Sequence, residues 1–139
     1  MVMVISSNHI LFFFILLVAP LVALSHEWGW FTYRHIYIKN DLEGNKVLKL
    51  HCKDKNNDLG VYELNYKDEF KFQFQSAFRP TLYFCGLTWD DKLHWFVVFD
   101  ENRDHHFCLD LHWSIRKDQP CVFNCDHNLY DCNFNYTYN

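Results

Sequence analysis

Apolar and polar residues alternate with a period of two along several stretches of this chain. In the segment EFKFQFQ, residues 69–75, every second residue is a phenylalanine. A longer alternation runs over residues 106–116, with five large apolar residues on one face and polar residues on the other. This period is typical of a strand with one buried and one exposed face. We therefore predict an antiparallel strand in each segment.

Further short segments favour strands because they are rich in β-branched and aromatic residues and are bounded by polar or turn-forming residues. They are residues 34–38, 47–52, 60–65, 81–87, 93–99 and 121–123. After residue 25, no segment has a helical period that competes with these assignments. About eight short strands predict an all-β fold, specifically a disulfide-bonded antiparallel β-sandwich with an aromatic core.

The segment HCKDKNNDLG, residues 51–60, interrupts this strand pattern. Just before it, Leu48, Leu50 and Cys52 would share one strand face, because they are spaced by two. Asp and Asn side chains hydrogen-bond their own backbone in turns, and Gly60 tolerates a positive φ. We therefore predict that residues 54–60 reverse the chain and display charge.

The N-terminal 25 residues contain no Lys, Arg, Asp or Glu, and residues 10–24 are almost wholly apolar. This apolar segment is shorter than the ~20 residues of a typical membrane span, and it ends in small residues. We therefore predict a secretory signal peptide over 1–25 and one domain over 26–139. An uncleaved membrane anchor is the alternative, and no other segment could cross a membrane.

The six cysteines all lie in residues 26–139. An even count in a small secreted domain predicts a disulfide framework of three bridges. We expect Cys108 to lie on the outward face of its strand and to bridge to the C-terminal segment. Cys121 and Cys125 are a poor pair in an extended chain, because four residues span about 13 Å. The bridging residues are Cys52, Cys85, Cys108, Cys121, Cys125 and Cys132, and Asn135 begins a glycosylation sequon.

Four segments resemble the plant self-incompatibility protein family, the S-protein homologues. They are IKNDL (38–42), HCKDKNNDLG (51–60), TLYFCGLTW (81–89) and HWSIRKDQPC (112–121). The resemblance covers nearly all of residues 26–139 and implies a small secreted β-sandwich. In poppy, a member of this family is the pistil signal that a pollen receptor recognises. Members usually carry a cysteine at the position of Leu111, and Cys125 is a candidate replacement for it, so the disulfide connectivity stays open.

The resemblance implies a non-enzymatic extracellular signalling ligand in the apoplast, recognised by a cell-surface receptor. We expect recognition to use loops, because a sandwich presents variable loops on a rigid frame. The candidate loops contain Lys53, Asp54, Lys55 and Asp58; then Asp90, Asp91 and Lys92; and finally Glu101, Arg103 and Asp104.

Two other function classes are alternatives. A cell-wall or carbohydrate-binding module would use exposed aromatic residues such as Trp28 and Trp30. A histidine-based hydrolase, such as a ribonuclease, would need a hairpin of residues 93–99 and 106–115 that sets His94 opposite His112. No third ligand or phosphate-binding cluster accompanies that pair. We therefore expect no catalytic residues, no metal and no cofactor, and a net charge of −4 argues against nucleic acid.

Histidine is frequent in this chain, and eight of its nine histidines lie in residues 26–139. The net charge is −4 with neutral histidines. Unperturbed histidines titrate near pH 6.5, so protonating all eight would reverse the sign of the charge. We therefore expect contact with a polyanionic cell-wall matrix such as pectin at mildly acidic pH.

Overall fold

The computed structural model describes residues 8, 10–17, 33–75 and 81–138, and it divides the chain into two units, Met1–Thr32 and Tyr33–Asn139. In the first unit, residues 10–17 form a helix with exposed side chains. Among the described residues, no helix is long and apolar enough to span a membrane. The cleavage site after Ser25 lies outside the described residues, so the signal peptide stays a prediction.

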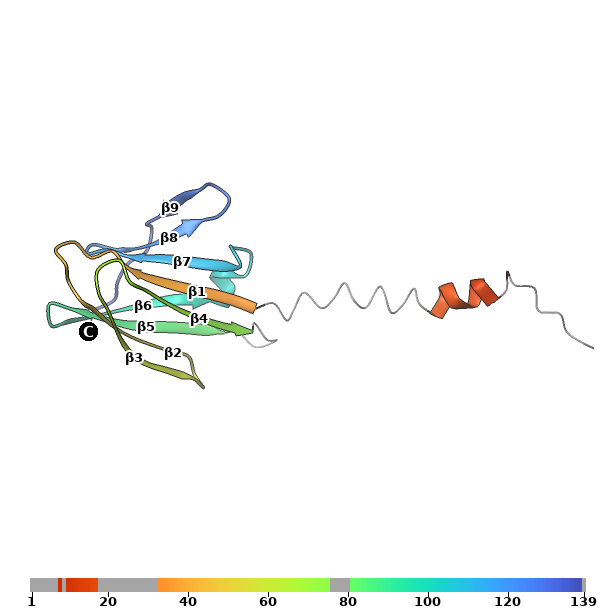
Figure 1. Ribbon diagram of the computed structural model, residues 1–139, viewed down its shortest axis with the longest axis horizontal. Helices are drawn as coiled ribbons and strands as arrows, with labels where there is room; N and C mark the ends of the chain where they lie inside the picture. The colour runs from red at the N-terminus through yellow and green to blue at the C-terminus, as the bar shows by residue number, and fades with distance from the viewer. Residues whose placement is uncertain (1–7, 9, 18–32, 76–80, 139) are drawn as a thin grey trace, which may run out of the picture. The chain divides into compact units, whose positions relative to one another are not determined.

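The second unit consists of two stacked β-sheets (Figure 1). The five-stranded sheet has the order β4-β1-β7-β8-β9 and the four-stranded sheet the order β3-β2-β5-β6. Neighbouring strands are antiparallel except β1 and β7, which are parallel. The strands are β1 (Tyr33–Asn40), β2 (Leu48–Lys53), β3 (Asp58–Leu64), β4 (Glu69–Gln75), β5 (Leu82–Trp89), β6 (Lys92–Asp100), β7 (Asp110–Ile115), β8 (Pro120–Asn124) and β9 (Leu129–Asp131). The expected all-β sandwich is confirmed.

The core lies between the sheets and follows the predicted alternation. Ile36 and Ile38 of β1 and Leu48 and Leu50 of β2 are fully buried. The three phenylalanines of β4 are only partly buried, because β4 is an edge strand, and they pack against the core from one side. The predicted aromatic core is also present, with Trp113 and the ring of Phe99 among its largest fully buried side chains.

The connection between β6 and β7 differs from the prediction. Glu101–Asp104 form a short helix, α2, and β7 begins only at Asp110. The Asp100 side chain accepts a hydrogen bond from the Asn102 backbone N–H (2.9 Å), which caps this helix. β6 and β7 also belong to different sheets. The hairpin that would set His94 opposite His112 is therefore wrong.

The reversal between β2 and β3 is shorter than predicted, because β3 already begins at Asp58. The Asp54 carboxylate accepts hydrogen bonds from the backbone N–H groups of Asn56 (2.8 Å) and Asn57 (2.5 Å), and so closes the turn. Gly60 lies within β3 at φ 85°, in the left-handed region that we expected it to adopt. The register of β2 against β3 shifts between His51 and Lys53, which accommodates this conformation.

Three disulfides join all six cysteines, as the even cysteine count predicted. Cys52–Cys85 links β2 to β5 inside the core, and Cys121–Cys132 links β8 to the segment after β9. Cys108–Cys125 confirms that Cys108 bridges to the C-terminal segment. The stated reason was wrong, because Cys108 precedes β7 and is 7% exposed instead of lying on an outward strand face.

Candidate recognition loops and a charged cleft

The three predicted loops lie at two opposite ends of the sandwich. Because β2, β5 and β6 are successively antiparallel, the β2–β3 turn and the β6–β7 connection lie at one end, and the β5–β6 turn lies at the other. Figure 1 shows α2 at the right end and the β5–β6 turn at the left. One ligand surface at a single end therefore cannot include all three loops.

In the first loop, the acidic residues maintain the turn and a lysine is displayed. Besides closing the turn, Asp54 receives a hydrogen bond from Tyr83, and burial together with this carboxylate raises the pKa of Tyr83 to about 12. Asp58 interacts with His51 Nε2 at 2.6 Å.

The Lys53 ammonium lies 5.5 Å from the centre of the Phe84 ring. Lys55 is exposed, and its side chain has no partner within the part of the chain that the structure describes.

The second loop is a tight turn at Asp90 and Asp91, whose φ angles are 50° and 59°. Asp90 forms an ion pair with Lys46 of the β1–β2 connection. Asp91 and Lys92 are exposed and have no side-chain partner among residues 33–75 and 81–138. This loop therefore presents one acidic and one basic side chain to solvent.

In the third loop, Asp104 does not lie on the surface as expected. It is 5% exposed, and its carboxylate accepts two hydrogen bonds from Arg103, at 2.8 and 2.7 Å, and one from the Asp100 backbone N–H at 2.9 Å. The Arg103 guanidinium lies over Trp113 and Phe134. Asp104 is therefore an internal support of the β6–β7 connection, and Glu101 is half-buried at the start of α2.

A charged cleft of about 580 Å³, which sequence analysis did not identify, lies at the same end as the β5–β6 turn. Parallel pairing sets Lys39 of β1 beside Ser114 of β7, so the residues that follow both strands meet. The lining side chains include Lys39, Lys67, Arg116, Lys117, Tyr66 and Tyr130. The acidic side chains in the lining are Asp41, Glu43 and Asp118. The charged runs directly after residues 38 and 115 were the only sequence signal for this site.

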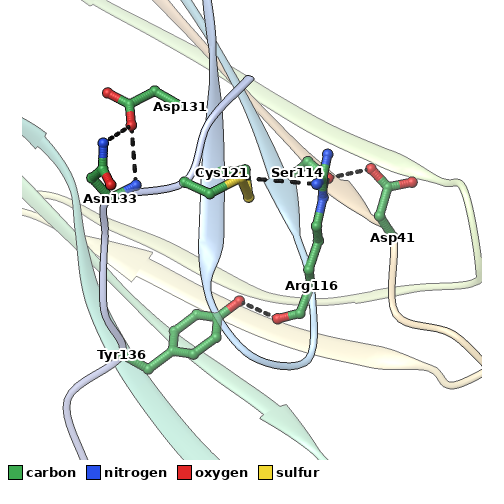
Figure 2. Close-up of a disulfide and its surroundings, with 8 residues drawn as sticks. Asp41, Ser114, Arg116, Cys121, Asp131, Asn133 and Tyr136 are labelled. Carbon is green, nitrogen blue, oxygen red and sulfur yellow. Dashed lines mark hydrogen bonds between the residues drawn. A yellow bond between two sulfur atoms is a disulfide. The ribbon is translucent and has the colours of Figure 1, made fainter. Parts of the chain in front are cut away.

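A chain of hydrogen bonds through Ser114 connects Arg116 and Asp41, two residues that line the charged cleft (Figure 2). Ser114 Oγ donates to Asp41 Oδ2 at 2.5 Å, and Arg116 Nε donates to Ser114 Oγ at 3.0 Å. Lys67 Nζ contacts the other oxygen of Asp41 at 2.7 Å. The guanidinium of Arg116 also lies 5.0 Å from the centre of the Tyr130 ring. Arg116 is therefore held in place although its side chain is exposed.

The surroundings of Asp41 predict a specific dependence of stability on pH. Partial burial alone would raise its pKa, but hydrogen bonds from Lys67 and Ser114 outweigh burial and hold the pKa below the usual range. A carboxylate with a lowered pKa stabilises the folded state above its unfolded pKa of about 3.9, and this stabilisation disappears as pH falls through the folded pKa.

Asp41→Asn should therefore lower the free energy of unfolding by about 1 kcal/mol at pH 7, and the difference from the unsubstituted protein should shrink below about pH 4. Denaturant titrations between pH 2 and pH 7 measure this difference. Asp126→Asn, at an exposed carboxylate, is the control. A difference that stays constant over the whole pH range would contradict the assignment.

The histidines are dispersed and do not form one cluster. His35 and His51 contact Asp110 and Asp58, at 2.9 and 2.6 Å. His94 is buried and stacks on Trp89 with ring centres 3.5 Å apart. His112 faces outward and stacks on Tyr37 at 4.2 Å. The exposed histidines are His105, His106 and His127.

Three further expectations concern a metal site, exposed tryptophans and a glycosylated asparagine. Within the described ranges, no group of three or more His, Cys, Asp or Glu side chains could hold a metal ion. Trp28 and Trp30 lie outside the described residues. Asn135 is exposed, and its neighbour Thr137 pairs with Trp95 through two backbone hydrogen bonds of 2.9 and 2.7 Å. Glycosylation at Asn135 stays a prediction.

The fold and its surfaces define a small disulfide-locked sandwich with charged loops at both ends. A family model described as plant self-incompatibility protein S1 matches residues 35–137, so the chain belongs to this family. S-protein homolog 18 of Arabidopsis thaliana is 34% identical over 110 residues, covering 73% of this chain and 80% of that protein. S-protein homolog 5 of the same plant is 39% identical over 82 residues, covering 58% of this chain and 64% of that protein, which is less than two thirds of its length.

A solved structure supports the same fold. It represents SPH (self-incompatibility protein homologue) proteins, described as a widespread family of small, highly stable, secreted proteins from plants. It is 20% identical, has a TM-score of 0.57, and the match covers 76% of this chain and 96% of that chain. The predicted family and extracellular location agree with these comparisons.

Proposed function

We propose that this protein is a non-enzymatic extracellular ligand that a cell-surface receptor recognises through the end loops. The observation that carries the proposal is that most acidic residues of these loops support the fold, whereas two lysines are displayed to solvent. Asp54, Asp58 and Asp104 have hydrogen-bond partners within the chain, whereas Lys55 and Lys92 are exposed at opposite ends with no side-chain partner in the described part of the chain.

Such an arrangement favours recognition because the exposed charges belong to loops whose supporting strands do not need to change conformation on binding. Three disulfides and two packed sheets fix the strands from which the loops emerge. Preformed surfaces lose less conformational entropy on binding than mobile segments do. Charge at the rim of an interface mainly determines partner choice and association rate, so receptor discrimination by these loops is physically reasonable.

Binding of the fluorescently labelled protein to plant protoplasts tests the receptor, because protoplasts lack the cell wall but keep their surface proteins. Lys55→Glu and Lys92→Glu change the charge equally at the two ends. Lys49→Glu is the matched control, since Lys49 is exposed on the outer face of the four-stranded sheet. We expect one end variant to bind at least about tenfold more weakly while the control is unchanged. Equal binding by all three variants would contradict recognition through the loops.

The histidines support an additional contact with the polyanionic cell-wall matrix. All described histidines of the second unit except His94 are at least partly exposed, and each imidazole that binds a proton adds positive charge to the surface. We expect stronger retention on a pectate column near pH 5 than near pH 7.5, with weaker retention in high salt because screened surface charge supplies the attraction. Retention that does not differ between these pH values would show that the histidines do not act together.

A further inference from the structure

We infer that the charged cleft binds a carboxylated saccharide, such as a segment of a uronic acid polymer. The inference deepens the proposed matrix contact by assigning it a site and a chemical class of ligand. The cleft volume of about 580 Å³ falls within the 300–1,000 Å³ typical of sites for small ligands.

The side chains of the cleft that remain available to a ligand have a net positive charge. Lys67 and Asp41 satisfy each other at 2.7 Å, and Ser114 donates to the second oxygen of Asp41. The charges that remain are the cations Lys39, Arg116 and Lys117 and the anions Glu43 and Asp118. A carboxylate that enters the cleft therefore meets more positive than negative side chains, and hydrogen bonds to a charged donor are the strong ones.

One of the available cations in the cleft is held before any ligand arrives. The Arg116 guanidinium is fixed by Ser114 at 3.0 Å and by the Tyr130 ring at 5.0 Å, and its Nη1 lies 3.8 Å from the sulfur of Cys132. Figure 2 shows this guanidinium between the disulfide and Ser114. Donors that are already positioned lose little side-chain entropy on binding.

The acidic residues of the lining favour a sugar over a simple polyanion. A sugar hydroxyl both donates and accepts hydrogen bonds, so Glu43 and Asp118 can accept from it while the cations donate to its carboxylate. A polyanion without hydroxyl groups would gain nothing from these two acids and would be repelled by them. Tyr66 and Tyr130, which are 40% and 43% exposed, add phenol groups that can donate or accept.

Isothermal titration of the secreted, disulfide-intact protein with oligogalacturonate at pH 7.5 tests the inference. This pH lies about one unit above the ordinary pKa of an imidazole and well below that of an ammonium or guanidinium group, so binding here tests the lysines and arginine of the cleft and not the histidine contact proposed above. We expect Arg116→Gln and Lys117→Gln each to weaken binding about tenfold, since each removes a charge-assisted hydrogen bond. Lys117 is exposed, so its variant keeps the test valid if Arg116→Gln fails to fold. Lys49→Gln, at an exposed lysine on the outer face of the four-stranded sheet, should bind as the unsubstituted protein does.

Two further probes define the ligand class. The methyl-esterified oligomer, which has the sugar rings but no carboxylate charge, should bind at least about tenfold more weakly. Poly-glutamate of equal length, which has the charge but no hydroxyl groups, should also bind more weakly. Equal affinity for either probe, or unchanged binding by both cleft variants, would overturn the inference. Binding at pH 7.5 together with pH-independent column retention would support the cleft and reject the histidine contact.

Discussion

Removing the buried Cys52–Cys85 disulfide with the double variant Cys52→Ala/Cys85→Ala should lower the free energy of unfolding by about 3–4 kcal/mol. The bridge closes a loop of sequence separation 33, against 17 and 11 for the other two bridges, so it constrains the unfolded chain most. Both cysteines are also fully buried between the sheets. A domain of this size is stable by only about 5–15 kcal/mol, so a large share of its stability depends on this bond.

Denaturant unfolding of purified protein under non-reducing conditions measures this difference, and secreted yield is a second readout. Lys55→Ala is the control, because changing an exposed charge usually alters stability by less than about 0.5 kcal/mol. We expect the double variant to be secreted poorly and the control normally. Equal unfolding free energies for the two variants would contradict a framework role for this disulfide.

The alternation of apolar and polar residues was sufficient to locate a strand wherever one face of that strand lies in the core. In β1 and β2 the buried residues are spaced by two, and the burial observed at Ile36, Ile38, Leu48 and Leu50 follows that spacing. The same rule located β4, although its three phenylalanines are only partly buried at the sheet edge. The three-residue β9 was not predicted, because a strand this short has too few residues to establish a period.

The connection after β6 shows where local patterning fails. Phe107 and Leu109 continue the alternation of β7, but Leu109 is 54% exposed and neither residue lies in a strand. Long-range contacts fix this segment instead. The Arg34 side chain donates to the carbonyl groups of His105 (2.9 Å) and Cys108 (3.2 Å), more than 70 residues away in sequence. A residue pattern read over ten positions contains no information on such contacts.

Of the candidate sites, the loops could be predicted from local sequence and the charged cleft could not. The charged residues in the sequence predicted the three loops. They did not distinguish an exposed residue such as Lys55 from Asp54, which closes its own turn. The charged cleft was missed because it depends on the parallel pairing of β1 with β7, two strands about 75 residues apart. Its lysines and arginine lie in three separate charged segments of the sequence, around Lys39, Lys67 and Arg116.

The second large effect is expected for Asp104→Asn, which should lower the free energy of unfolding by about 2–3 kcal/mol. The substitution keeps the shape of the side chain but places an amide N–H₂ opposite donors from Arg103 and the Asp100 backbone. A donor that loses its acceptor inside a protein retains its full desolvation cost, and this cost is greater when the group is charged. Chemical denaturation at pH 7 measures the difference, with Asp126→Asn as the exposed control.

This experiment also separates a framework role for Asp104 from a recognition role. If Asp104 supports the fold, protoplast binding by Asp104→Asn should fall only in proportion to the folded fraction, because the side chain is 5% exposed and cannot reach a receptor. Arg103→Lys should produce an intermediate loss of stability of about 1–2 kcal/mol, since lysine keeps the charge but cannot make the paired hydrogen bonds of the guanidinium. Normal stability of Asp104→Asn combined with lost binding would instead assign Asp104 to the recognition surface.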